Sequence, residues 1–168
     1  KGIGKQFYCD QPKVHDYLHE LNKHSFGKIK ECITVGEMSA TSVENCIGYT
    51  NPDNQELDMV FSFHHLKVDY FNKEKWTIMP FDFQELKELL NTWQVKMQDG
   101  NGWNALFWNC HDQPRSVSRF GNDQKYRKLS AKMLATTIHL MRGTPYIYQG
   151  EEIGMTNHYF TDIKQYQD

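Results

Sequence analysis

The chain has 168 residues, of which 39% are hydrophobic and 14% aromatic, so it can bury a core and is not expected to be disordered. The formal net charge is -2 and the basic residues are dispersed, which argues against nucleic acid or an anionic membrane surface as a partner. No hydrophobic run approaches the roughly 18 residues that a membrane span needs.

The cysteines indicate reduced thiols. They lack the close spacing of metal ligands, and they are too few to suggest a disulfide scaffold. A cytoplasmic protein is therefore expected. No signal peptide is apparent, and because the chain starts at Lys1 without a methionine, residues before it are left open. The cysteines are Cys9, Cys32, Cys46 and Cys110.

Helical and strand patterns alternate along the chain. A helix is expected at about 12–22, which Asp10 can cap, followed by a strand at 32–35, a short helix at 42–47 and a strand at 59–63. The clearest helix runs from 83 to 97, with Asp82 as its N-cap and Glu85 three residues on. A strand at 104–108, a long helix at 126–141 and a strand at 146–148 complete the pattern.

Strands separated by helices imply an α/β fold with parallel pairing and right-handed crossovers. Four strands are too few for a closed (β/α)₈ barrel, which typically needs about 250 residues. No internal repeat or linker is visible. We therefore expect a single incomplete unit that resembles half of a barrel.

Polar residues follow the expected strands, where parallel sheets bind their ligands. A carboxylate at one strand end and a His-Asp pair at another is the layout of a sugar-cleaving site. Other interpretations stay open: Glu37 could cap or solvate a loop, and the His-Asp pair could form a structural turn. Adjacent histidines on an extended segment point to opposite faces and would not readily chelate one ion. The strand-end residues are Glu37, His64, His65, His111, Asp112 and 149–152.

Three motifs carry a specific resemblance. Residues 35–39 (VGEMS), 107–115 (FWNCHDQPR) and 143–152 (GTPYIYQGEE) resemble successive signatures of the α-amylase superfamily of retaining glycoside hydrolases. Within it, residues 61–70 (FSFHHLKVDY) resemble the trehalose-6-phosphate hydrolases, the phospho-α-1,1-glucosidases. Related oligo-1,6-glucosidases generally lack a lysine at position 67. The resemblance covers essentially the whole chain and implies about strands 5 to 8 of a (β/α)₈ barrel.

The resemblance also implies roles for individual residues. Glu37 matches the general acid/base, Asp112 the carboxylate that grips the sugar and stabilises the transition state, and His111 its neighbour. Retaining glycosidases need a protonated carboxyl and an ionised nucleophile, and a third charged group lowers the barrier further. Further substrate-binding candidates are His65, Arg115, and Lys67 with Lys75 second for a 6-phosphate, although these lysines could equally be solvated surface charges.

Two departures from the family pattern matter. Cys110 stands where the family usually has Asn, and a thiol is a much weaker hydrogen-bonding group, so an effect on efficiency is expected. The nucleophilic Asp of the family precedes the segment matching 7–10, so no residue of this chain can be named the nucleophile. The N-terminal half-barrel and a C-terminal β-domain are likewise expected to lie outside residues 1–168, and the chain alone is expected to be inactive.

The expected activity of the parent protein is therefore hydrolysis of trehalose 6-phosphate to glucose and glucose 6-phosphate. Its partner would be this phosphorylated disaccharide, and the carboxylate mechanism requires no cofactor or metal. An oligo-1,6-glucosidase or related α-glucosidase is the nearby alternative. From another class, the chain could be a non-catalytic fragment, and its open strand edges could allow self-association.

Overall fold

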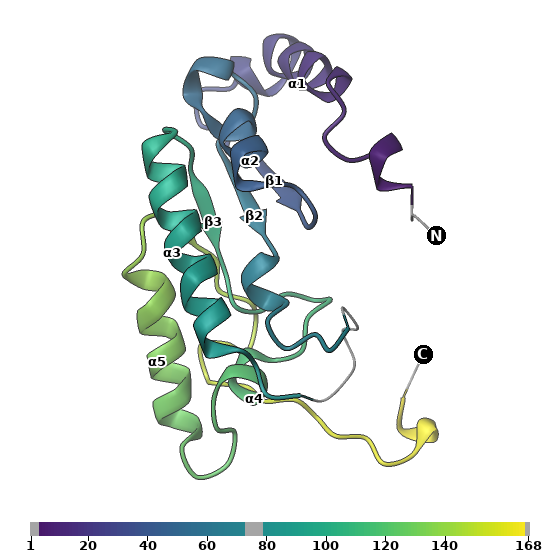
Figure 1. Cartoon of the computed structure of the whole chain (residues 1–168), viewed down its shortest axis with the longest axis vertical. Coiled ribbons are helices and arrows are strands. Elements are labelled where there is room, and N and C mark those ends of the chain that lie inside the picture. Colours follow the sequence, from purple (N-terminus) through teal and green to yellow (C-terminus); the bar gives the residue numbers. More distant parts are fainter. Residues whose placement is uncertain (1–3, 73–78, 167–168) are drawn as a thin grey trace. The chain divides into compact units, whose positions relative to one another are not determined.

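The computed structural model describes residues 4–72 and 79–166. These residues form two compact units, 4–72 and 79–106 with 141–146, and 107–140 with 147–166. Figure 1 labels the helices α1 to α5 and the strands β1 to β3. Within the described residues no helix is long and hydrophobic enough to cross a membrane.

The first unit holds a parallel sheet in the order β1-β2-β3-β4. Its strands are β1 (Val35–Met38), β2 (Met59–Ser62), β3 (Asn104–Leu106) and β4 (Thr144–Pro145). Glu37 is in register with Phe61, and Leu106 with Pro145. The prediction of an α/β fold with parallel strands is confirmed. As an edge strand, β1 leaves one row of backbone groups open, and beside it Ile33 is 69% exposed.

The described part of the first unit contains the α-helices α1 (Lys13–His24), α2 (Val43–Thr50) and α3 (Phe83–Asp99). Helices α2 and α3 contact one another, and α2 also contacts β2. The side chain of Ser42 caps α2, and that of Asp82 accepts a hydrogen bond from the Glu85 N–H, as predicted. The buried core between these elements consists of Val43, Cys46, Tyr49, Val60, Trp93 and Met97.

The second unit contains α4 (Ser116–Phe120) and α5 (Arg127–His139). Trp108 is only 1% exposed, and its indole N–H donates to the Leu134 carbonyl of α5. Its ring also packs on Phe120, with centroids 5.4 Å apart. This buried tryptophan therefore joins the segment after β3 to both helices. Short 3₁₀ helices also occur, at Lys5–Phe7, Phe26–Lys28, Pro52–Asn54, His64–Leu66 and Ile163–Gln165.

The sequence placed the first strand three residues too early. The backbone N–H and hydroxyl of Thr34 both donate to the Asp58 carboxylate, and strand pairing begins only with Val35 opposite Met59. Asp10 is also not the cap of α1, because Pro12 takes that position. The backbone of Asp10 is instead left-handed, with a φ of 49°.

The last strand was placed two residues too late. Strand β3 ends at Leu106, whose carbonyl accepts the Tyr146 N–H at 2.7 Å. Residues after Tyr146 therefore have no β3 residue left to pair with. Strand β3 is itself shorter than the strand expected at 104–108, because it ends at Leu106.

Candidate active site

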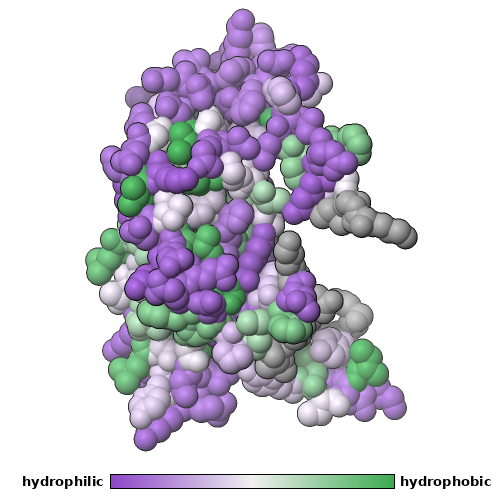
Figure 2. All heavy atoms as spheres, viewed as in Figure 1, coloured by the Kyte–Doolittle hydropathy of each residue, from purple (hydrophilic) through white to green (hydrophobic). Residues whose placement is uncertain are grey.

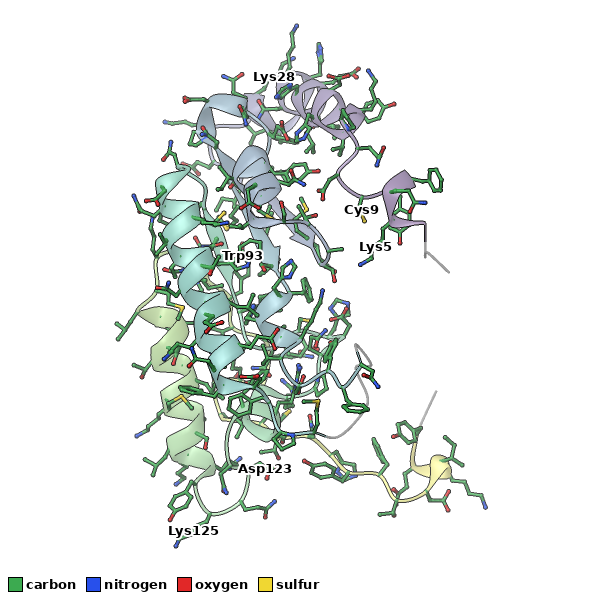
Figure 3. The ribbon with its side chains drawn as sticks, viewed as in Figure 1. Lys5, Cys9, Lys28, Trp93, Asp123 and Lys125 are labelled. Carbon is green, nitrogen blue, oxygen red and sulfur yellow. The ribbon has the colours of Figure 1, made fainter. Side chains whose placement is uncertain are left out.

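Glu37, the candidate acid/base, lies near the carboxyl end of β1. Its side chain is exposed and lines a cavity of about 640 Å³ within the first unit. Lys5 and Asp10 come from the N-terminal segment, and Ser39 from the loop after β1. Figure 3 shows Lys5 pointing from its short 3₁₀ helix toward this loop. The cavity thus combines the candidate carboxyl with a cation.

A buried tyrosine closes the inner wall of this cavity. The Tyr49 hydroxyl donates to Asp10 Oδ1 at 3.3 Å, and its ring stacks on His15 with centroids 4.9 Å apart. Burial, followed by the Asp10 charge, raises the pKa of Tyr49 to about 12. The phenol is therefore a neutral hydrogen-bond donor at neutral pH, and Asp10 serves as its acceptor.

Lys67 lies beside the loop that follows Glu37. Its ammonium donates to the carbonyl oxygen of Ser39 and lies 3.4 Å from the Ser39 hydroxyl. Burial, and to a smaller extent the charge of Lys5, lower the pKa of Lys67. The structure therefore brings Glu37 and Lys67 to the same side of the sheet, at the ends of two adjacent strands.

The other residues predicted after β2 have different positions. His65 lies in the 3₁₀ helix His64–Leu66 and is half-buried. Its neighbour His64 turns to the loop after β1, where Nε2 lies 2.9 Å from the Thr41 carbonyl oxygen. Lys75 lies outside the described residues. The substrate-binding roles of His65, Lys67 and Lys75 stay predictions.

In the second unit, His111 and Asp112 are exposed on one turn. The turn is closed by a hydrogen bond from the Gln113 N–H to the Cys110 carbonyl. Inside it, the Cys110 thiol donates to Asp112 Oδ1 at 2.8 Å. The thiol that replaces the family's amide therefore contacts the candidate transition-state stabiliser.

A buried asparagine anchors this turn. Asn109 is 5% exposed, its amide donates to the Ser116 hydroxyl at 3.0 Å, and its carbonyl oxygen accepts the Ser116 N–H at 2.6 Å. Ser116 is the first residue of α4 and is itself 2% exposed. The two reciprocal bonds fix both ends of the segment that presents His111 and Asp112 to solvent.

Arg115 connects this turn to the segment after β4. One guanidinium N–H donates to the Gln149 carbonyl at 2.6 Å, and the group lies 4.9 Å from the centre of the Tyr148 ring. The Arg115 backbone N–H donates to Asn157 at 2.7 Å. These contacts give Arg115 a structural part in the loop, and its binding of substrate stays a prediction.

The predicted site residues thus fall into two groups. Glu37, His65 and Lys67 belong to the first unit, and His111, Asp112 and Arg115 to the second. The convergence of Glu37 and Asp112 on one sugar ring stays a prediction. Over residues 4–72 and 79–166, no cluster of His, Cys, Asp and Glu could hold a metal ion.

Comparison with known proteins decides the family. The family model for the α-amylase catalytic domain matches residues 2–168. The chain belongs to the α-amylase family. Its parallel strands and alternating helices are part of the (β/α)₈ barrel of α-amylase catalytic domains.

Several characterised α-amylase-family proteins are similar over the whole chain. The trehalose-6-phosphate hydrolase of Bacillus subtilis is 64% identical over 168 residues, and that of Escherichia coli is 55% identical over 167. The oligo-1,6-glucosidase of Parageobacillus thermoglucosidasius is 49% identical over 165 residues. The alignments cover 100%, 99% and 98% of the chain. The chain spans 30%, 30% and 29% of these proteins' own lengths.

Solved structures give the same result. The crystal structure of trehalose-6-phosphate hydrolase from Bacillus licheniformis superposes with a TM-score of 0.95 at 61% identity, covering 100% of this chain and 30% of that one. Isomaltulose synthase from Erwinia rhapontici superposes with a TM-score of 0.83 at 34% identity, covering 94% and 28%. The α-amylase fold is therefore retained in proteins with different named activities.

Proposed function

We propose that the protein containing this chain is a retaining α-glucosidase that hydrolyses trehalose 6-phosphate to glucose and glucose 6-phosphate. The observation that carries this proposal is the 64% identity to a trehalose-6-phosphate hydrolase over all 168 residues. Identity to the oligo-1,6-glucosidase is lower, at 49%. Lys67 also favours a trehalose-6-phosphate hydrolase, because the oligo-1,6-glucosidases generally lack a lysine at this position.

In this proposal Glu37 protonates the leaving oxygen and later activates water. Its exposed position at a strand end, in a cavity of about 640 Å³, gives a sugar access to it. Asp112 hydrogen-bonds ring hydroxyls more tightly as positive charge develops on the sugar, with His111 beside it. We further propose that the nucleophile comes from outside residues 1–168, so this half-barrel alone is inactive.

Lys67 is the proposed ligand of the 6-phosphate, with Lys75 second. An ammonium has three N–H donors, and the carbonyl and hydroxyl of Ser39 account for two of them. Among the residues that the structure describes, these two contacts leave one donor for a phosphate oxygen. Lys5 adds a second cation to the same region, and a bound dianion would offset the mutual repulsion of the two lysines.

Two further properties, one of the parent protein and one of the isolated chain, complete the proposal. All four cysteines are free thiols, which favours a cytoplasmic location. The open edge of β1, beside the exposed Ile33, supports self-association of the isolated chain. Mass measurement in solution tests the second point, and a strict monomer would remove it.

The full-length protein should be assayed on trehalose 6-phosphate and on isomaltose. Faster hydrolysis of the phosphorylated substrate is expected, and preference for isomaltose would favour the oligo-1,6-glucosidase alternative instead. In the same protein, Lys67→Ala should raise KM for trehalose 6-phosphate much more than for an unphosphorylated glucoside. Equal KM changes for both substrates would remove the phosphate role of Lys67.

A further inference from the structure

The loop after β1 begins two residues beyond Glu37 and is held by side chains of the segment that follows β2. Residues 39–42 connect β1 to α2. The imidazole of His64 donates to the Thr41 carbonyl at 2.9 Å, and the ammonium of Lys67 donates to the Ser39 carbonyl. Both donors come from the 3₁₀ helix that follows β2 and from its C-terminal cap. Two backbone carbonyls of one loop are thus bound from one short segment.

His64 is itself held by the core. Its ring stacks on Trp93 of α3 with centroids 5.4 Å apart and an interplanar angle of 28°, and Trp93 is only 9% exposed. Figure 3 labels Trp93 on the ribbon of α3. Leu66, between the two donors, is fully buried. The donors therefore project from a rigid base, and the loop they bind is fixed relative to that base.

Two further constraints hold the loop: the pairing of β1 with β2 at its start, and the burial of Thr41 near its end. Glu37 is in register with Phe61 and Met38 with Ser62, two residues before His64. Thr41 is 6% exposed, and its hydroxyl lies 3.8 Å from the Met38 sulfur. The backbone on the carboxyl side of Glu37 thus has few ways to move. The exposed side chain of Glu37 keeps its own rotamer freedom.

We propose that His64 and Lys67 are positioning residues for Glu37, whose backbone they hold in place through the carbonyls of Thr41 and Ser39. The inference rests on the proposed role of Glu37 as acid/base. A proton donor must lie within hydrogen-bond reach of the leaving oxygen, and a displacement of 1 Å can reduce the rate about 100-fold. The pair therefore acts on kcat for any glucosyl substrate, phosphorylated or not. Lys67 thus has two proposed roles: it binds the 6-phosphate, and it helps to position the acid Glu37.

His64 provides the first test, in the full-length enzyme with p-nitrophenyl α-glucoside and with trehalose 6-phosphate. His64→Ala should lower kcat about tenfold or more on both substrates, with KM for the glucoside changing less than about threefold. His64→Gln, whose amide can donate to Thr41, should recover most of kcat. The matched control is His139→Ala, which removes a similar histidine-to-carbonyl contact on α5 and should leave kcat unchanged.

Lys67 provides an independent test if His64→Ala does not fold, as judged by its thermal unfolding. Lys67→Ala should lower kcat for p-nitrophenyl α-glucoside, although that substrate carries no phosphate, and Lys67→Arg should keep most of it. Unchanged kcat on the glucoside in every alanine variant that folds would overturn the positioning role. A wild-type enzyme inactive on both substrates would instead defeat the proposed function, so the two failures are distinguishable.

Discussion

The Cys110 thiol donates a hydrogen bond to Asp112 Oδ1 across 2.8 Å, within a single turn. The donor lies two residues before the acceptor, and the turn is closed by the Gln113 N–H and the Cys110 carbonyl. A thiol is a weak donor and an amide is a stronger one. The Asp112 carboxylate, which we propose to bind the sugar, is therefore oriented by a thiol that withdraws little of its negative charge.

Removing this thiol should reduce catalysis without unfolding the protein. A hydrogen bond to a charged group contributes roughly 1.5–3 kcal/mol, and a thiol should lie at or below the lower end. We expect Cys110→Ala to lower kcat/KM of the full-length enzyme about 3–10-fold at an unchanged melting temperature. Cys110→Ser, which keeps a donor, should stay within about twofold of wild type. An alanine variant as active as wild type would mean that the bond has no catalytic effect.

The anchor of the same turn should matter for stability. Asn109 is buried and forms two hydrogen bonds with Ser116. Asn109→Ala leaves the buried Ser116 N–H without its acceptor, so the free energy of unfolding should fall by about 2 kcal/mol. Ser116→Ala removes only the hydroxyl and should cost about half as much. Urea denaturation of the full-length variants measures both values, and a larger loss for Ser116→Ala would contradict the assignment.

Local signals in the sequence predicted helices α1, α2, α3 and α5, as the Asp82 cap of α3 shows, but not the short helix α4. The supporting contacts were not predictable in this way. His64 and Thr41 are 23 residues apart, and Lys67 and Ser39 are 28 apart. Such pairs depend on the register of β1 against β2, and the sequence placed β1 three residues too early. The turn that contains His111 and Asp112, by contrast, was visible in the sequence as a possible structural turn.

Two glycines should respond to alanine with opposite signs. Gly143 has a φ of 152°, and an added Cβ would lie 2.6 Å from the Asn104 carbonyl oxygen, which belongs to the backbone of β3. Neither the backbone strain at this φ nor the clash with the β3 backbone can be relieved by a small shift. Gly143→Ala should therefore lower the free energy of unfolding by more than about 1 kcal/mol. Gly48 lies in α2 with nothing within 4 Å of an added Cβ, so Gly48→Ala should stabilise by about 0.5–1 kcal/mol. Thermal unfolding of both variants measures the signs, and destabilisation by Gly48→Ala would contradict the open space there.

Figure 2 shows hydrophilic side chains over most of the upper part of the face in view and a mixture of hydrophilic and hydrophobic ones below. On the first unit, one carboxylate is buried beside two histidines and another is exposed beside a lysine. Glu56 has a side chain that is 2% exposed, with both oxygens 2.9 Å from His15 Nδ1 and one 3.3 Å from His19 Nε2. It therefore ties α1 to the residues before β2. Glu44 instead pairs with Lys96 at 2.6 Å in an exposed setting.

The buried carboxylate of Glu56 should contribute to the free energy of unfolding, and the exposed carboxylate of Glu44 should not. Glu56→Gln keeps the shape of the side chain but removes the charge that both histidines contact, so the free energy of unfolding should fall by about 1–3 kcal/mol. Glu44→Gln should cause no measurable change, because exposed pairs are screened by water and salt. Urea denaturation compares the two variants under one condition. Equal losses in both variants would show that burial does not set the strength of the Glu56 contacts.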